Sequence, residues 1–92
     1  MHKEKVLIIK LGYSETLDGE IGMITSLGDV LRSTVLLHLY KGAHVTWLVD
    51  ENAFPLLRGN PFIHRILSYN ITSILQLQSE RFDTVINLEK VP

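Results

Sequence analysis

A serine, a glycine and an aspartate at the start of one helical segment are the residues of this chain best suited to chemistry. Ser26, Gly28 and Asp29 come shortly before a long apolar run, where the chain is expected to enter a helix. The positive end of a helix keeps a first-turn carboxylate ionised, and such a carboxylate can accept a proton from a hydroxyl. Gly28 lacks a Cβ, so a ligand can approach first-turn amides that hold anionic groups. Asp29 is therefore the predicted general base.

The same residues also fit a purely structural role. Ser26-x-x-Asp29 before an apolar run approximates a capping box, in which Ser26 accepts from a first-turn amide and Asp29 bonds back to the Ser26 amide. An Asp29 carboxylate that faces an open cleft would favour the catalytic interpretation, and one that is bonded only to the backbone would favour the capping interpretation. The sequence leaves both interpretations open.

Two more charged residues are expected near this helix start. Lys10 ends the first apolar run, and Glu89 follows the last one. In an open parallel sheet, ligands bind outside the carboxyl ends of the strands, where the strand order reverses. We therefore predict that Lys10 and Glu89 are neighbours at this point and bind substrate together with Ser26 and Gly28, and that Lys10 meets an anionic group. A solvated strand end is the alternative for Lys10.

Strand and helix patterns alternate along the chain. Strands are predicted at 5–10, 45–49, 63–69 and 84–88, and helical segments at 27–41, 53–58 and 71–81. This alternation predicts an α/β, Rossmann-like parallel sheet of four strands, in the order 3-2-1-4, with helices on both faces. One face would be covered by the last helix alone. We therefore expect the single domain 1–92 either to lead a larger domain or to form a homo-oligomer, through strand 84–88 or the uncovered face.

The helices carry further predictions. In the first helix, one apolar face at helical spacing consists of Leu27, Val30, Leu31, Thr34 and Val35. Leu36, Leu37 and Leu39 extend the apolar surface, so this helix is predicted to be covered on more than one side. Gly42 is expected to end it in a left-handed cap. In the last helix, the predicted apolar residues are Ile71, Ile74, Leu75 and Leu77. Asn70 begins a glycosylation sequon, but a helix cap is the better interpretation.

Composition argues against several classes of function. A net charge of −1 without a basic stripe gives no basis for nucleic-acid binding. The chain has no cysteine, and its four histidines lack ligand spacing, so no metal is expected. No apolar run approaches the roughly 20 residues of a spanning helix, so we expect a cytoplasmic protein with at most peripheral contact with the inner membrane face. Neither a P-loop nor a G-x-G-x-x-G motif follows the first strand, so the sequence gives no support for nucleotide binding there.

A long segment separates the first strand from the first helix. Residues 13–25 far exceed the roughly 2 to 6 residues usual for such a connection. This insertion is interpreted as a lid or specificity loop beside the site, with an ordered surface excursion as the alternative.

Five segments, in order, resemble the N-terminal part of glycosyltransferase family 9, the ADP-heptose:lipopolysaccharide heptosyltransferases. They are Lys5–Gly12, Ser26–Leu31, His44–Asp50, Leu56–Pro61 and Phe82–Leu88. The resemblance spans nearly the whole chain and departs from the family at the 13–25 insertion, because the family commonly passes directly from its first strand to the Ser-Leu-Gly-Asp motif.

The resemblance implies a GT-B fold, with an acceptor-binding first domain and a second domain that holds the ADP-sugar. It implies that Asp29 is the base of an inverting, metal-independent transfer and that Lys10 lies near a lipid-linked or sugar acceptor. No cofactor is expected on this chain, since the ADP-sugar would bind the absent second domain, and residues 1–92 alone are expected to be inactive. The alternative from another class is a non-catalytic Rossmann-like module that binds an anionic metabolite or assembles through its sheet edge.

Overall fold

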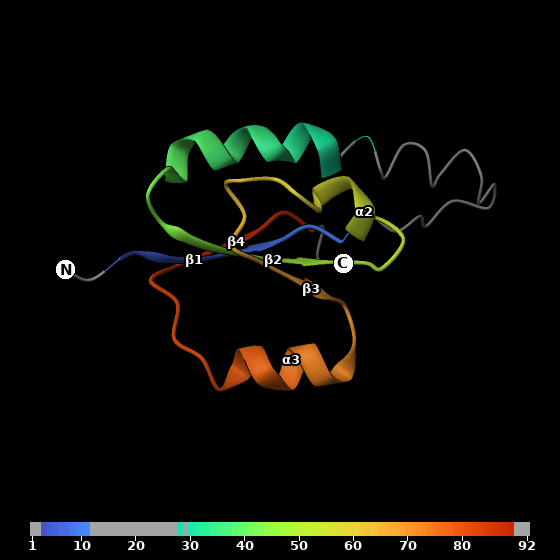
Figure 1. The fold of residues 1–92 in the computed structure, drawn as a ribbon. Coiled ribbons are helices and arrows are strands. Elements are labelled where there is room, and N and C mark those ends of the chain that lie inside the picture. Colours follow the sequence, from blue (N-terminus) through green and yellow to red (C-terminus); the bar gives the residue numbers. More distant parts are fainter. Residues whose placement is uncertain (1–2, 12–27, 29, 90–92) are drawn as a thin grey trace.

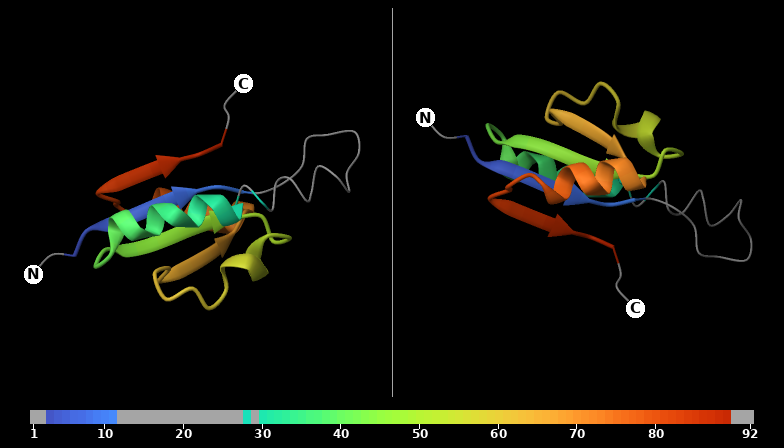
Figure 2. Two further views of the ribbon diagram at one scale, coloured as in Figure 1. Left: turned by 90° about the horizontal axis from the view of Figure 1, so that it is seen from above. Right: turned by 90° about the horizontal axis from the view of Figure 1, so that it is seen from below.

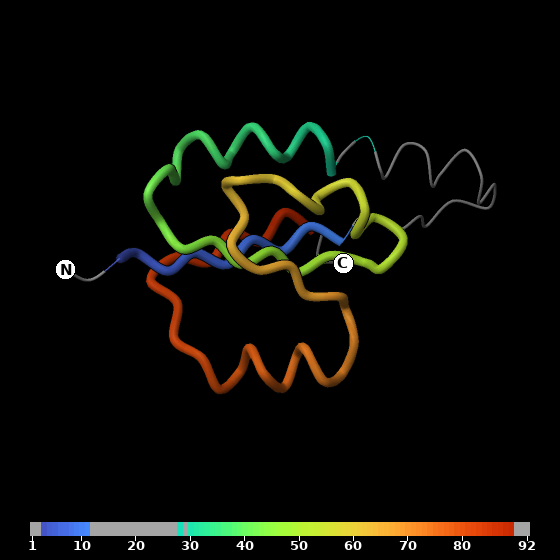
Figure 3. The backbone as a smooth tube through the Cα atoms, in the orientation of Figure 1, coloured from blue at the N-terminus to red at the C-terminus, as the bar shows by residue number. Residues whose placement is uncertain are grey.

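The computed structural model describes residues 3–11, 28 and 30–89. Its strands are β1 (Lys5–Ile9), β2 (His44–Val49), β3 (Arg65–Ser68) and β4 (Thr84–Asn87). Residues 30–33 are α-helical and continue into the 3₁₀-helix η1 (Thr34–Tyr40), and two α-helices follow, α2 (Phe54–Leu57) and α3 (Ile71–Gln78). Figure 3 follows the chain through these elements from the amino to the carboxyl end.

The four strands form one parallel sheet in the order β3-β2-β1-β4, which confirms the predicted topology. β1 lies at the centre, where Ile8 pairs with Trp47 of β2 on one side and Ile86 of β4 on the other. The chain builds outward from β1 through β2 to β3 and then returns to the far side of β1 as β4 (Figure 2). The strand order therefore reverses between β1 and β4.

Helices cover both faces of the sheet, as predicted, but unequally. The first helix and α2 lie on one face and α3 lies alone on the other (Figures 1 and 2). Alternate residues of β1 serve the two faces, so Val6 and Ile8 join the larger core under the first helix and Leu7 joins the smaller one under α3. An apolar hollow of about 340 Å³ remains between α3 and the sheet. The face that was expected to be poorly covered is thus the α3 face.

The first helix turns only part of its predicted apolar face to the sheet, since Val30 is fully buried in the larger core. Three of its apolar residues, Leu31, Val35 and Leu39, are 50%, 64% and 74% exposed. Residues 34–40 form a 3₁₀-helix with about three residues per turn, so Thr34, Leu37 and Tyr40 stack along one side. Leu37 is fully buried and Tyr40 packs against the larger core. The prediction is therefore right for Val30 and wrong for Leu31 and Val35. Contact of the exposed side with a further domain stays a prediction.

Two predicted helix ends are confirmed. Gly42 follows η1 with φ at +89°, a left-handed conformation that glycine adopts without strain. Asn70 is the N-cap of α3, and its Oδ1 accepts the Ser73 N–H over 2.8 Å.

The apolar face of α3 is only half as predicted. Leu77 packs against the sheet core and Ile74 lines the hollow beneath the helix. Ile71 and Leu75 are 76% and 61% exposed. The side that faces the sheet runs through Ser73, which is buried, and positions 71 and 75 are each two residues, or about 200°, away from it.

Candidate functional site at the strand switch point

Lys10 lies just past the carboxyl end of β1, where the central strand leaves the sheet. Its N–H donates to the carbonyl of Leu48 over 3.3 Å, and its carbonyl accepts the Trp47 Nε1–H over 3.2 Å. The Trp47 side chain is fully buried, so this second bond ties the Lys10 backbone to the core. The next carbonyl, of Leu11, accepts the Asp50 N–H over 2.8 Å. The backbone that carries the Lys10 side chain is therefore fixed against β2.

Glu89 follows β4 and spans the switch point. The Leu88 N–H donates to the carbonyl of Ile9 over 2.9 Å, and the Glu89 carboxylate accepts a short hydrogen bond from the Leu11 N–H. The Asn87 Oδ1 in turn accepts the Glu89 N–H over 2.9 Å. The Glu89 side chain thus joins the end of β4 to the end of β1. In this position the Glu89 side chain can fix the relative positions of the ends of β1 and β4, which border the candidate site.

An open hollow of about 380 Å³ lies beside these strand ends, against the first helix. It is lined by Lys10, Arg32, Ser33, Val35, Leu36 and Leu88. Its volume is at the lower end of the range for small-molecule pockets, about 300 to 1,000 Å³, and its place at a strand reversal is where open α/β sheets bind ligands. Its lining combines two cationic side chains and one hydroxyl with the apolar Val35, Leu36 and Leu88, which suits a ligand that has both an anionic and an apolar part. We call it the switch-point hollow.

The sequence-predicted residues divide into two groups. Lys10 lines the switch-point hollow, and Glu89 binds the backbone beside it. Gly28 is helical, and a Cβ added to it would lie 3.5 Å from the Arg32 Nη1, an ordinary contact. Packing among the described residues therefore does not demand glycine there. Ser26, Asp29 and the insertion 13–25 lie outside the described residues, so the base, the capping box and the lid stay predictions.

Sequence reasoning did not include Arg32 and Ser33 in the site. Both line the switch-point hollow beside Lys10. Arg32 lies four residues after Gly28, and residues four apart share one face of a helix. The four-residue spacing from Gly28 could have indicated Arg32, because a basic side chain in the first turns of a helix can reach a ligand bound at the start of that helix.

The described residues carry no sign of a metal centre or a membrane span. Within 3–11, 28 and 30–89, no three His, Asp or Glu side chains gather as metal ligands do. In the same part of the chain, no helix combines the length and apolar character needed to cross a bilayer.

Comparison with known proteins gives no relative. No family model, no curated protein and no solved structure matches this chain.

Proposed function

We propose that this chain is the N-terminal, acceptor-side part of a GT-B glycosyltransferase that resembles the heptosyltransferases. Such an enzyme transfers a sugar from a nucleotide-sugar to an acceptor of the lipopolysaccharide-core type. The observation that supports this proposal most is the switch-point hollow, which lies at the β1–β4 reversal and includes Lys10. The residues that suggest the family lie close to this hollow in the sequence, because Gly28 is helical and precedes Arg32 and Ser33, which line it, and Asp29 is the next residue along the chain.

The proposed reaction needs one proton acceptor and one oriented hydroxyl. The acceptor oxygen attacks the anomeric carbon, the bond from that carbon to the nucleotide diphosphate breaks, and the hydroxyl proton passes to Asp29. A carboxylate at a helix start is stabilised as an anion and is a weak base, so the proton moves late, as the new bond forms. Lys10 and Arg32 would hold acidic groups of the acceptor, which fits an anionic saccharide.

An alternative function from another class is favoured by the sheet edge. β4 pairs with β1 alone among the described strands, and Val85 within it is 55% exposed. An exposed apolar edge strand is a template for pairing with another chain. A non-catalytic Rossmann-like module that assembles through β4, or binds an anionic metabolite at the switch-point hollow, would show these features.

Saccharide binding tests the proposed function on the chain itself. We expect an acidic core-type saccharide, titrated into ¹⁵N-labelled protein, to shift the amide signals of Lys10, Ser33 and Leu88 in a saturable way. Lys10→Gln should weaken this binding about fivefold, which corresponds to a lost contact of about 1 kcal/mol. Lys41→Gln is the matched control, since Lys41 follows η1 and does not line the hollow. Saturable shifts that avoid these amides, or equal losses in both variants, would contradict the proposed acceptor site.

A further inference from the structure

A second charged hollow lies at the opposite edge of the sheet, where the strands begin. It has a volume of about 340 Å³ and is lined by Lys3, Lys5, His44, Arg65 and Glu80. Lys5 and His44 open β1 and β2 and pair with each other in the sheet register, and Arg65 opens β3. We call this hollow the amino-edge pocket. It shares no residue with the switch-point hollow.

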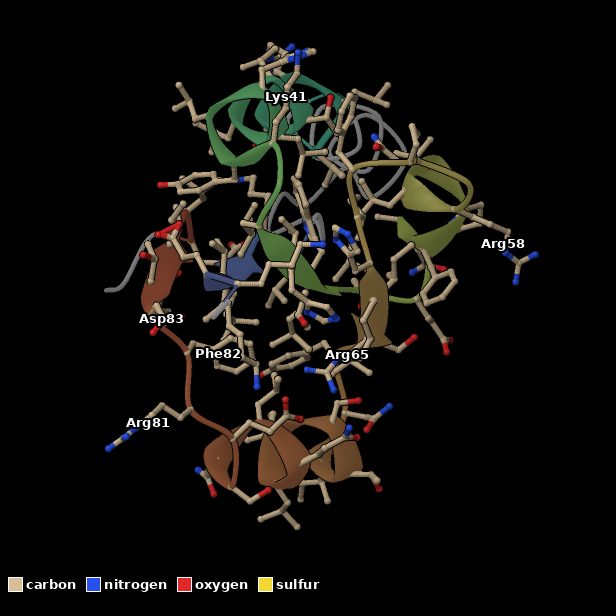
Figure 4. All side chains as sticks on the ribbon, turned by 60° about the vertical axis from the view of Figure 1, so that its left-hand side comes forward. Lys41, Arg58, Arg65, Arg81, Phe82 and Asp83 are labelled. Carbon is tan, nitrogen blue, oxygen red and sulfur yellow. The ribbon has the colours of Figure 1, made fainter. Side chains whose placement is uncertain are left out.

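The Arg65 guanidinium is held rigidly at this pocket. Its Nη1 and Nη2 donate to the two carboxylate oxygens of Glu80 over 3.1 and 2.7 Å. Its Nε and Nη2 also donate to the Thr46 Oγ1 over 3.2 and 3.1 Å, and Thr46 is fully buried. Figure 4 shows Arg65 between the sheet and α3, on the same side as Phe82. The single carboxylate that lines the pocket is thus already committed to Arg65.

The two lysines of the pocket have no such partner. Within the part of the chain that the structure describes, neither the Lys3 nor the Lys5 ammonium group forms an ion pair. The Lys5 Nζ lies 5.6 Å from the centre of the Phe82 ring, which limits the positions of its side chain without neutralising its charge. Among the lining residues, Arg65 and Glu80 compensate each other, so the two lysines leave the lining with a net positive charge. The nearby Asp83 carboxylate accepts the backbone N–H of Lys5 over 2.8 Å.

Two titratable groups that line the pocket have shifted pKa values. The pKa of His44 lies below its usual value, chiefly because burial disfavours the charged ring and then because His64, Arg65 and Lys5 repel it. The pKa of Glu80 is also lowered, chiefly by the hydrogen bonds from Arg65, with attraction by Arg65 and Lys5 added against the opposing effect of burial. In both groups the charge of Lys5 is a smaller contribution that acts in the same direction as the observed shift.

We propose that the amino-edge pocket binds a small phosphate-bearing molecule, with Lys3 and Lys5 contacting the phosphate and Arg65 forming the fixed wall. A phosphate monoester carries about 1.5 to 2 negative charges at neutral pH, which matches two unpaired ammonium groups. The volume of about 340 Å³ exceeds that of a phosphate group and leaves room for a small organic part. This site does not depend on the proposed sugar transfer, because it lies at the other edge of the sheet.

Inorganic phosphate is the probe that tests this proposal. We expect its titration at pH 7.5 and constant ionic strength to produce saturable shifts at the amides of Lys5, His44 and Arg65. Equal shifts with sodium chloride alone would overturn the proposal, as would phosphate shifts confined to Lys10, Arg32 and Ser33.

Matched lysine variants make the test specific. Lys5→Gln should weaken phosphate binding about fivefold, and Lys41→Gln should leave it unchanged. The control removes an ammonium group in an equivalent setting, since the Lys41 Nζ lies 5.7 Å from the Phe62 ring but outside the pocket. Lys3→Gln is the second variant, because Lys3 precedes β1 and its exposed side chain has no role in the sheet. Unchanged binding in both pocket variants, with folding intact, would overturn the assignment.

Discussion

The orientation of η1 can be tested with two leucines that lie two residues apart. Leu37 is 1% exposed and belongs to the larger core, whereas Leu39 is 74% exposed. Truncation of each to alanine removes the same three carbon atoms and changes helix propensity in the same way. The difference between Leu37→Ala and Leu39→Ala therefore isolates burial, which depends on which side of η1 faces the sheet.

The expected cost of Leu37→Ala follows from its burial. Loss of three buried carbon groups at about 0.8 kcal/mol each amounts to about 2.4 kcal/mol. An unfilled cavity adds to this value, and buried Leu→Ala changes cost about 2.7 to 5 kcal/mol, so we expect about 3 kcal/mol. Leu39→Ala should cost less than about 0.5 kcal/mol. A domain of 92 residues has a free energy of unfolding of about 5 to 14 kcal/mol, so the first variant should lose a large share of it.

Urea unfolding followed by tryptophan fluorescence measures both variants. Trp47 is the single tryptophan of the chain and is fully buried, so its emission reports loss of the core around it. The midpoint should fall strongly for Leu37→Ala and hardly at all for Leu39→Ala. Equal costs, or a larger cost for Leu39→Ala, would show that η1 does not present the side seen in the structure.

Two further predictions concern acid stability and helix capping. The folded protein lowers the pKa of His44, so the unfolded chain binds this proton more readily and the stability should fall as the pH drops through the usual value of 6.5 towards the folded value. His44→Gln should therefore make the urea midpoint less dependent on pH between about 7 and 5, and an unchanged dependence would contradict the burial of this ring. Asn70→Ala removes the cap bond to the Ser73 amide and should cost about 1 kcal/mol, whereas Asn70→Asp should retain most of the stability. If the aspartate variant unfolds as readily as the alanine variant in urea, the cap is not formed through this side chain.

The topology could be predicted from the sequence because it depends on coarse features. The continuous apolar runs of β1 and β2 indicate strands buried on both faces, and their alternation with helices leaves few arrangements of a parallel sheet. The order β3-β2-β1-β4 follows from those rules. Gly42 and Asn70 were also predictable, because each residue type has a specific local role at a helix end.

The faces of the helices were harder to predict. In the first helix, Val30 is buried as predicted, but Leu31 and Val35 of the same predicted face are exposed, and Leu37 and Tyr40 pack against the core instead. In α3, the side that packs against the sheet contains Ser73, and the side that contains the more apolar Ile71 is exposed. Packing against the sheet decides between such alternatives, and the spacing of apolar residues in one sequence does not contain that information.

The candidate site was predictable where it depends on topology. Lys10 and Glu89 follow adjacent strand ends, so the strand order alone brings them to one edge. Arg32 and Ser33 were missed because their approach to that edge depends on the rotation of the first helix. The amino-edge pocket was missed for a similar reason, since it gathers residues from the start of β1, from β2 and β3, and from the segment that follows α3.

The most direct test of the proposed sugar transfer is the effect of Asp29→Asn on turnover. The assay measures release of ADP from an ADP-sugar by the protein expressed from the whole reading frame that encodes these residues. Asparagine retains an oxygen that can accept a capping hydrogen bond but cannot act as the base, so the thermal midpoint should stay constant while turnover falls about 10² to 10⁴-fold. Unchanged turnover, or a loss of turnover that only parallels a loss of folding, would contradict the assignment of Asp29 as the general base.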